Sequence, residues 1–263
     1  MQFGMPTLIE HQTFEEAAQL CKELGLAFIE LNMNLPAVSQ AILSGDPCET
    51  QHLRRIADSF GLYFTIHLEE NMNICDFNPA VADAYLLTVR QAIRTAKEID
   101  APLLNMHLHK GVYFTLPDGK AYLYERYPAH YRKSLEVFRQ LCEKEVTGNG
   151  PVISIENTSG YAAFEKPAIE FLLESDTFAL TWDIGHSHSA NEADEPFLLK
   201  HADKLRHFHI HDANGNKNHL PLSAGKVDIA SRLDIAQKHG CRCVIETKTA
   251  AALRDSVSWL QNS

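Results

Sequence analysis

The sequence begins with an apolar run, Phe3-Gly4-Met5-Pro6-Thr7-Leu8-Ile9, which is followed directly by Glu10-His11-Gln12. The run is too short for a helix and has the apolar composition of a buried strand. In an open doubly wound sheet, a glycine-rich phosphate-binding turn usually follows the first strand. No G-x-G-x-x-G motif follows here, which favours a closed α/β barrel over an open sheet.

Short apolar runs and longer amphipathic segments alternate along the rest of the chain. The runs expected to be strands are Phe3–Ile9, Ala27–Leu31, Tyr63–His67, Leu103–His107, Val152–Glu156, Ala179–Asp183, His207–His211 and Cys241–Glu246. The segments expected to be helices are Phe14–Leu24, Thr50–Phe60, Pro79–Ile99, Tyr131–Val146, Lys166–Glu174, Asp194–Asp203, Ile229–His239 and Ala250–Leu260. Eight such units predict a (β/α)8 TIM barrel. Because no linker or change of composition interrupts them, we expect residues 1–263 to form one domain.

The composition restricts the classes of function. Of 263 residues, 45% are hydrophobic, and the formal net charge is −10. This acidic balance makes nucleic acid an unlikely partner, because phosphate binding depends on clustered Lys and Arg. No apolar run reaches the roughly 18 residues of a membrane span, and the first residues lack the pattern of a secretory signal. We therefore expect a cytoplasmic protein with no membrane partner and with reduced cysteines.

Two connections between the expected elements are unusually long, at residues 109–128 and 212–227. Long loops in compact domains are usually functional or disordered. The first contains several aromatic residues, among them Tyr113 and Phe114. We expect this loop to form a packed lid and to contact the substrate through Tyr113 and Phe114.

Polar side chains end six consecutive strands of the expected barrel. In TIM barrels the active site forms at the C-terminal ends of the strands. The side chains at these ends that can bind a metal or transfer a proton are His67, His107, Glu156, Asp183, His209 and Glu246. Each alone is readily explained as a structural residue. Together they indicate a functional site, because a carboxylate beside apolar strand residues is costly to bury unless it is paired or bound to a metal.

A divalent metal ion is the natural partner of Glu156, Asp183, His209 and Glu246. Three carboxylates with one imidazole suit Mn²⁺, Co²⁺ or Mg²⁺, whereas a histidine-rich ligand set favours Zn²⁺ as the alternative.

Several further residues lie near these strand ends and could contact the metal ligands or the substrate. Strand alternation places His207 and His211 on the same face as His209, with His207 deeper in the barrel and His211 at the rim. Glu30, at the end of the second strand, could reach the barrel mouth or form a surface salt bridge. For His109 and Lys110, a solvated turn is favoured over contact with the substrate.

Five motifs around the later strands occur in the order that is typical of one known superfamily. They are Ile155-Glu156-Asn157-Thr158, Trp182-Asp183-Ile184-Gly185-His186, Phe208-His209-Ile210-His211-Asp212, His219 with Pro221-Leu222 and Gly225, and Val244-Ile245-Glu246-Thr247. On these residues the sequence resembles the xylose isomerase-like TIM-barrel superfamily. This superfamily groups sugar isomerases and epimerases with endonuclease IV.

The resemblance to the ketose 3-epimerase branch implies a metal-dependent isomerase or epimerase of a carbohydrate or a related polyhydroxy-carbonyl compound. In that branch the counterparts of the four ligands hold one ion. The counterparts of Glu156 and Glu246 then remove and return the proton next to the carbonyl group, through an enediolate. The resemblance also implies that His186 contacts a substrate hydroxyl group. We expect His211 and His219 to line the substrate site as well.

The endonuclease IV branch implies an alternative, a metal-dependent phosphodiesterase with three zinc ions. His67 and His107 match its first zinc site, although both could instead donate hydrogen bonds to a substrate. For the third zinc, His219 matches the required histidine, but Lys217 stands where an aspartate is needed. The usual Gly-Glu-Gly is also replaced by Ser223-Ala224-Gly225. These departures argue against a trinuclear centre and DNA repair.

Other functions on the same scaffold stay open at this point. They are a dehydratase or lyase and a barrel that binds a sugar without catalysis, because a fold does not fix a function. Members of the superfamily often form homo-oligomers, but no residue pattern in this sequence indicates an interface.

Overall fold

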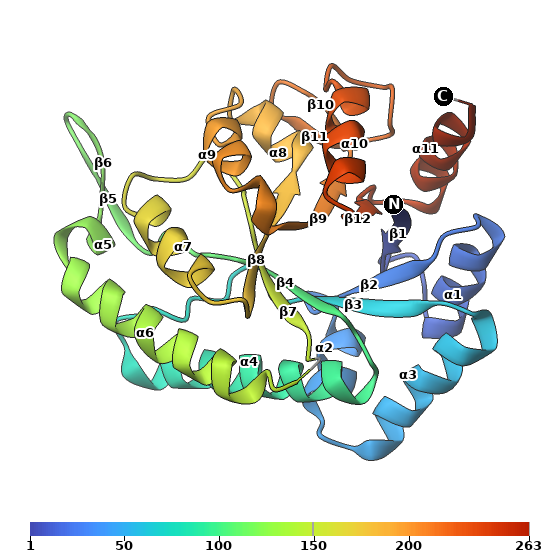
Figure 1. Cartoon of the computed structure of the whole chain (residues 1–263), viewed down its shortest axis with the longest axis horizontal. Helices are drawn as coiled ribbons and strands as arrows, with labels where there is room; N and C mark the ends of the chain where they lie inside the picture. The colour runs from blue at the N-terminus through green and yellow to red at the C-terminus, as the bar shows by residue number, and fades with distance from the viewer. Residues whose placement is uncertain (149, 263) are drawn as a thin grey trace.

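Eight parallel strands close into a barrel at the centre of the protein, with helices packed around them (Figure 1). The structure is a computed structural model that describes residues 1–148 and 150–262. The barrel strands are β1 (Gln2–Pro6), β2 (Phe28–Asn32), β3 (Tyr63–His67), β4 (Leu103–His107), β7 (Val152–Glu156), β8 (Phe178–Asp183), β9 (Leu205–Ile210) and β12 (Arg242–Ile245). Each strand pairs in parallel with the next along the chain, and β12 closes the barrel against β1. The predicted (β/α)8 barrel is therefore confirmed.

The helices begin and end largely where the amphipathic pattern predicts. They are α1 (Phe14–Glu23), α2 (Pro36–Leu43), α3 (Pro47–Phe60), α4 (Pro79–Glu98), α5 (Leu123–Arg126), α6 (Pro128–Glu145), α7 (Glu165–Leu173), α8 (Ile184–Ser189), α9 (Glu195–Lys200), α10 (Ile229–Lys238) and α11 (Ala250–Asn262). Local signals fix several of these ends. Thr13 caps α1 by accepting a hydrogen bond from the Glu16 amide at 3.2 Å. Gly61 ends α3 in the left-handed conformation at φ 70°.

Some boundaries differ from the sequence prediction. The first strand ends at Pro6 and not at Ile9, although the Thr7 amide still donates to the Glu30 carbonyl oxygen at 2.9 Å. The helix expected over 194–203 is divided into α9 and a 3₁₀ turn, Ala202–Lys204. Helices α2, α5 and α8 were not predicted. Helix α8 contains glycine, serine and histidine, which are poor helix formers, so its sequence carries little helical signal.

The inside of the barrel is polar, and this is what positions the site. Apolar residues on the outward faces of the strands pack beneath the helices as the hydrophobic core. On the inward faces, Thr65, Asn105, Ser154 and Thr181 are fully buried. The Thr181 hydroxyl lies 2.6 Å from Asn105 Oδ1 and 2.7 Å from Ser154 Oγ, and the Asn105 amide donates to Glu156. The polar layer therefore supports the base of the strand-end side chains.

Two antiparallel hairpins interrupt the repeating pattern after β4 and β9. The first pairs β5 (Tyr113–Leu116) with β6 (Gly119–Tyr122), and the second pairs β10 (Asp212–Asn214) with β11 (Lys217–Leu220). Figure 1 shows the β5–β6 hairpin extending away from the body of the molecule. The expected packed lid is therefore only partly correct. Tyr113 and Phe114 on the hairpin are 44% and 58% exposed, whereas the following segment is packed through Tyr124.

No described helix is long and apolar enough to cross a membrane. All six cysteines are free thiols, and only Cys48 is exposed.

Candidate metal centre

Four strand ends bring Glu156, Asp183, His209 and Glu246 together at the mouth of the barrel. Glu156 and Asp183 are the last residues of β7 and β8, His209 lies one residue before the end of β9, and Glu246 directly follows β12. Asp183 and His209 are opposite each other in the β8–β9 register. One ligand atom from each of the four side chains lies within 4.8 Å of the others, and all four residues are buried. The structure thus assembles the predicted ligand set.

The His209 ring lies among the three carboxylates of this set. Its Nδ1 atom is 3.1 Å from Glu246 Oε2, 3.3 Å from Glu156 Oε2 and 3.9 Å from Asp183 Oδ2. Within the described part of the chain, neither ring nitrogen makes an aligned hydrogen bond. Burial opposes a charge on this ring, but the surrounding carboxylates outweigh it and raise the pKa of His209 well above its ordinary value.

The charge balance of this group fits a divalent cation. Burial alone would raise the pKa values of Glu156 and Glu246, yet the charge of His209 holds both pKa values well below the ordinary range. Three ionised carboxylates therefore surround one imidazole, with Lys248 Nζ on the outer side, 2.8 Å from Glu246 Oε1. An ion among them would satisfy the carboxylate oxygens and the unpaired His209 nitrogen together.

A second group of ligands shares Glu156 with the first. His67 Nε2 and His107 Nε2 each lie 3.3 Å from Glu156 Oε2. His67 Nδ1 lies 2.7 Å from the Leu68 carbonyl oxygen, and because a carbonyl only accepts, Nδ1 carries a hydrogen. The Nε2 atom, which faces Glu156, then has a lone pair in the neutral ring and a second hydrogen in the protonated ring. Although burial opposes it, Glu156 raises the pKa of His67 to about 9. These two histidines are therefore placed either to bind a second cation or to act as hydrogen-bond donors.

His186 stands between the two groups and the solvent. Its Nδ1 atom lies 3.5 Å from Glu156 Oε1 and 3.3 Å from Asp183 Oδ2. Asp183 also caps helix α8, because its Oδ1 atom accepts the His186 amide at 2.6 Å. The same aspartate therefore belongs to the ligand set and fixes the backbone that carries His186. With 20% of its side chain exposed, His186 is accessible from the mouth.

His211 lies deeper than the sequence predicts. It was expected at the rim, but it is fully buried, with Nε2 3.0 Å from Asp183 Oδ1. The His219 amide donates to His211 Nδ1 at 2.9 Å. A backbone amide can only donate, so the proton of a neutral His211 is on Nε2 and faces Asp183. A Cβ atom at Gly185 would lie 1.9 Å from the ring, so this packing requires glycine.

The loop after β9 holds His219 beside the centre. Asp212 is buried and accepts hydrogen bonds from the amides of Ala213, Gly225 and Val227 at 2.8, 2.7 and 3.0 Å. His219 Nδ1 lies 3.8 Å from Glu246 Oε1, and burial lowers the pKa of His219 to about 4.

Three histidines that the sequence predicts to line the substrate site form a cluster, although the sequence did not predict His211 as part of a possible ligand set. His186, His211 and His219 each offer a ligand atom within 4.8 Å of the others. Lys217 is exposed on β11. Lys217 occupies the position where the endonuclease IV pattern has an aspartate, and it points to solvent. The residue that joins His186 and His219 instead is His211, which directly follows β9. Since both nitrogens of His211 already have partners, the arrangement favours a role in orienting Asp183.

A cavity of about 480 Å³ opens beside the centre. It is lined by Glu70, Asn71, His107, Leu108, His109, Lys110, Gly111, Tyr113, Lys120, Tyr122, Thr158, Ser159 and His186. The lining is mostly polar and includes Tyr113, whereas Phe114 does not line the cavity.

The solvated turn favoured for Lys110 is wrong, since only 19% of its side chain is exposed and its Nζ atom donates to Ser159 Oγ at 3.0 Å.

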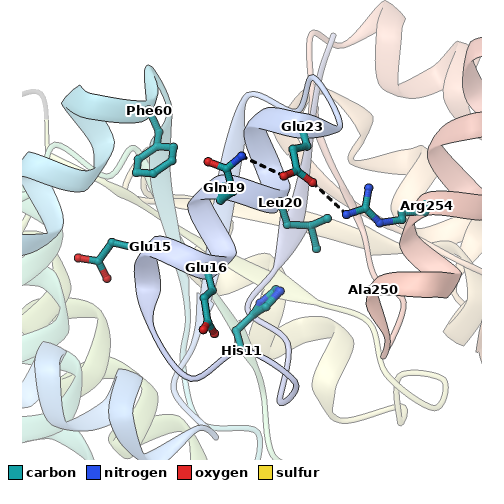
Figure 2. A pocket seen from close by; sticks show the side chains of 9 residues that line it. All are labelled: His11, Glu15, Glu16, Gln19, Leu20, Glu23, Phe60, Ala250 and Arg254. Atoms are coloured by element: carbon teal, nitrogen blue, oxygen red, sulfur yellow. Dashed lines mark hydrogen bonds and ion pairs between the residues drawn. The ribbon is translucent and has the colours of Figure 1, made fainter.

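A groove of about 470 Å³ lies on the outside of the barrel between α1 and α11 (Figure 2). Its acidic Glu23 contacts Gln19 at 2.9 Å and Arg254 at 3.0 Å. The groove shares no residue with the histidine and carboxylate clusters, so the cavity beside the centre is the better candidate site.

A family model described as xylose isomerase-like TIM barrel matches residues 18–263. The chain belongs to this family. An uncharacterised protein of Methanocaldococcus jannaschii is 31% identical over 177 residues, which are 66% of this chain. The match spans 65% of that relative's own length.

Several solved structures share the fold. A D-tagatose 3-epimerase-like protein is 20% identical with a TM-score of 0.78, covering 100% of this chain and 96% of its own. Endonuclease IV from Thermus thermophilus is 16% identical with a TM-score of 0.70, covering 100% of both chains. The IOLI protein, crystallised with a zinc atom, is 13% identical with a TM-score of 0.76, covering 100% of this chain and 97% of its own. At these identities the likeness establishes the fold alone.

Of the two interpretations given to Glu30, the structure supports an inward position and not a surface salt bridge. A surface salt bridge was one interpretation, but Glu30 is 1% exposed and contacts His207 and His209 inside the barrel. His207 lies deep in the barrel, as predicted. Glu30 comes two residues before the end of β2, and its contact with β9 across the barrel had no signal in the sequence of either strand.

Glu165 in the wall behind the cavity makes stability depend on pH. Burial raises its pKa to about 7, from an ordinary value of 4.5. Between these two values the unfolded chain loses the proton and the folded chain keeps it, so the stability of the wild type falls as pH rises. Relative to Glu165→Gln, we expect the wild type to lose about 3 kcal/mol of unfolding free energy between pH 4 and pH 8. Urea denaturation at both pH values measures this.

The exposed Glu125→Gln variant is the matched control and should follow the wild type at both pH values. An unfolding free-energy difference between Glu165→Gln and the wild type that is the same at pH 4 and pH 8 would contradict the buried, neutral state of Glu165.

Proposed function

We propose that this protein is a divalent-metal-dependent epimerase or isomerase of a carbohydrate or a related polyhydroxy-carbonyl compound. One observation carries the proposal: Glu156 and Glu246 share a buried cluster with Asp183 and His209, beside a polar cavity. Membership of the xylose isomerase-like family and the likeness to an epimerase-like structure support it. Mn²⁺, Co²⁺ or Mg²⁺ would suit the carboxylate-rich set, with Zn²⁺ as the alternative.

The four residues of the cluster would hold the ion, which supplies polarisation of the substrate oxygens when bound. The low pKa values of Glu156 and Glu246 keep both carboxylates ionised and able to accept a proton. The two glutamates come from β7 and from the end of β12, on different sides of the barrel mouth. One ionised glutamate would remove the proton next to the carbonyl group. The other would first take up a proton from solvent and then donate it to the enediolate.

The cavity residues would bind and orient the substrate. His186 and His107 line the cavity and also contact Glu156, so they reach both the substrate and the centre. Hydroxyl groups of a carbohydrate match the polar lining, including Asn71 and Thr158. Tyr113 would close one side of the cavity from the β5–β6 hairpin.

An endonuclease IV-like phosphodiesterase is the second candidate function. The observation that favours it is the group of His67, His107 and Glu156, which could hold a second ion. The net charge of −10 opposes it, because DNA binding gains affinity from phosphate contacts with Lys and Arg. This candidate predicts at least two zinc ions per chain and cleavage of DNA at abasic sites.

Hydrogen exchange separates the two functions. The full-length protein is treated with a chelator, divided, and reloaded with Mn²⁺, Co²⁺ or Zn²⁺ in D₂O. With D-tagatose and other ketoses as substrates, we expect deuterium to enter the carbon next to the carbonyl group only after reloading. Abasic DNA is incubated with the same samples and should stay intact. Cleaved DNA without deuterium in any ketose would overturn the proposal in favour of the phosphodiesterase.

A further inference from the structure

A second buried cluster lies directly below the proposed metal centre. Glu30, His207 and His209 each offer a ligand-type atom within 4.8 Å of the others. Glu30 belongs to β2, whereas both histidines belong to β9. These strands are not neighbours, because β1 and β12 lie between them in the barrel. Glu30 therefore reaches the histidines through the interior of the barrel.

Both oxygens of Glu30 have defined partners. Oε1 lies 2.8 Å from His209 Nε2, and Oε2 lies 2.9 Å from His207 Nε2. The Thr65 hydroxyl also donates to Oε2 at 3.3 Å. His207 is fully buried, so the carboxylate is held on one side by His207 and Thr65 and presents its other oxygen to His209.

The two nitrogens of His209 thus face different groups. Nε2 faces Glu30, while Nδ1 faces Glu156 and Glu246 in the centre above. The 2.8 Å contact between Glu30 and Nε2 is close but not aligned as a hydrogen bond. Because a carboxylate can only accept, its charge at this distance favours a hydrogen on Nε2. A neutral imidazole with its hydrogen on Nε2 has its lone pair on Nδ1, which is the atom that faces the centre.

We propose that Glu30 is a positioning residue: it fixes the ring and tautomer of His209 so that Nδ1 is presented to the divalent ion. The inference rests on the proposed function only in requiring that an ion binds there. A carboxylate that hydrogen-bonds the far nitrogen of a metal-bound histidine orients the ring and strengthens it as a ligand. Glu30 itself does not belong to the four-residue ligand set and does not act on the substrate.

A purely structural role makes a different prediction. If Glu30 served only to hydrogen-bond His207, its removal would affect folding and would leave the affinity for the ion unchanged. Metal affinity, measured on folded protein, separates the two roles.

The test compares full-length wild type, Glu30→Gln and Glu165→Gln, each confirmed as folded by circular dichroism. Zn²⁺ and Mn²⁺ affinities are measured by competition with a chelator of known affinity. We expect Glu30→Gln to bind the ion about 10- to 100-fold more weakly, with the same stoichiometry. Glu165→Gln removes another buried carboxylate outside the clusters and should bind like the wild type. Equal affinities of wild type and Glu30→Gln would overturn the role of Glu30.

A second measurement needs no substitution and covers the case in which Glu30→Gln does not fold. In zinc-loaded wild type labelled with ¹⁵N-histidine, we expect His209 to carry its hydrogen on Nε2. A hydrogen on Nδ1 would overturn the inference. If the wild type itself binds no ion, the proposed function fails, whereas equal affinities or the other tautomer overturn only the role of Glu30.

Discussion

Replacing Glu246 with glutamine is expected to lower the rate of proton exchange into the substrate by about 10²- to 10⁴-fold, the range typical of a lost acid–base group. Glutamine has the same shape but cannot accept a proton at neutral pH. The substitution also replaces an anionic ligand beside His209 Nδ1, so the ion is expected to bind more weakly. Deuterium incorporation at saturating metal isolates the loss of the base from the loss of the ion.

The exposed Glu125→Gln variant controls for loss of a surface charge and should exchange at the wild-type rate. Lys248→Gln is a more demanding control, because it removes the cation that lies 2.8 Å from Glu246 Oε1 while keeping the carboxylate. It should retain far more exchange than Glu246→Gln. If Glu246→Gln with bound metal exchanges as fast as the wild type, Glu246 is not an acid–base group.

Replacing Glu156 with glutamine is expected to destabilise the metal-free protein by about 3–5 kcal/mol at pH 6, the cost of breaking a buried ion pair. Glu156 lies within 3.5 Å of His67, His107, His186 and His209, and its side chain is 1% exposed. Glu156 raises the pKa values of His67, His186 and His209, so without its charge these three rings lose an anion that stabilises their protonated forms. Urea denaturation in the presence of a chelator measures the loss.

The destabilisation by Glu156→Gln should shrink as pH rises. Glu156 raises the pKa of His67 to about 9, above the ordinary 6.5. A raised histidine pKa stabilises the fold fully below pH 6.5, and this stabilisation is lost as pH rises through 9. The difference between wild type and Glu156→Gln should therefore be larger at pH 6 than at pH 9.5. An equal difference at both values would mean that the charge of His67 does not contribute to it.

The barrel and the grouping of the four candidate ligands were predictable from the sequence for one physical reason. In a parallel barrel all strands end at the same rim, so a polar residue that ends an apolar run has a predictable place. Glu156, Asp183, His209 and Glu246 each follow this rule. The rule needs no knowledge of side-chain contacts, because the closed topology alone brings the strand ends together.

Other features depended on contacts that no local pattern encodes. The role of Glu30 follows from its reach across the barrel to β9, which requires the strand order and not the strand itself. Alternation placed His211 at the rim, but β9 ends at Ile210 and Gly185 lets helix α8 pack over the ring. The exposure of Phe114 follows from the β5–β6 hairpin, whose aromatic residues indicated a packed lid.

The most direct test of a metal centre at the strand ends is anomalous diffraction from crystals of the protein loaded with Mn²⁺. We expect an anomalous peak bounded by Glu156, Asp183, His209 and Glu246, with His209 Nδ1 as the histidine ligand. The same peak should be absent from crystals of Asp183→Asn grown under matched conditions or be strongly reduced in them. A fully loaded wild-type crystal with no peak among these four residues would contradict a metal centre at the strand ends.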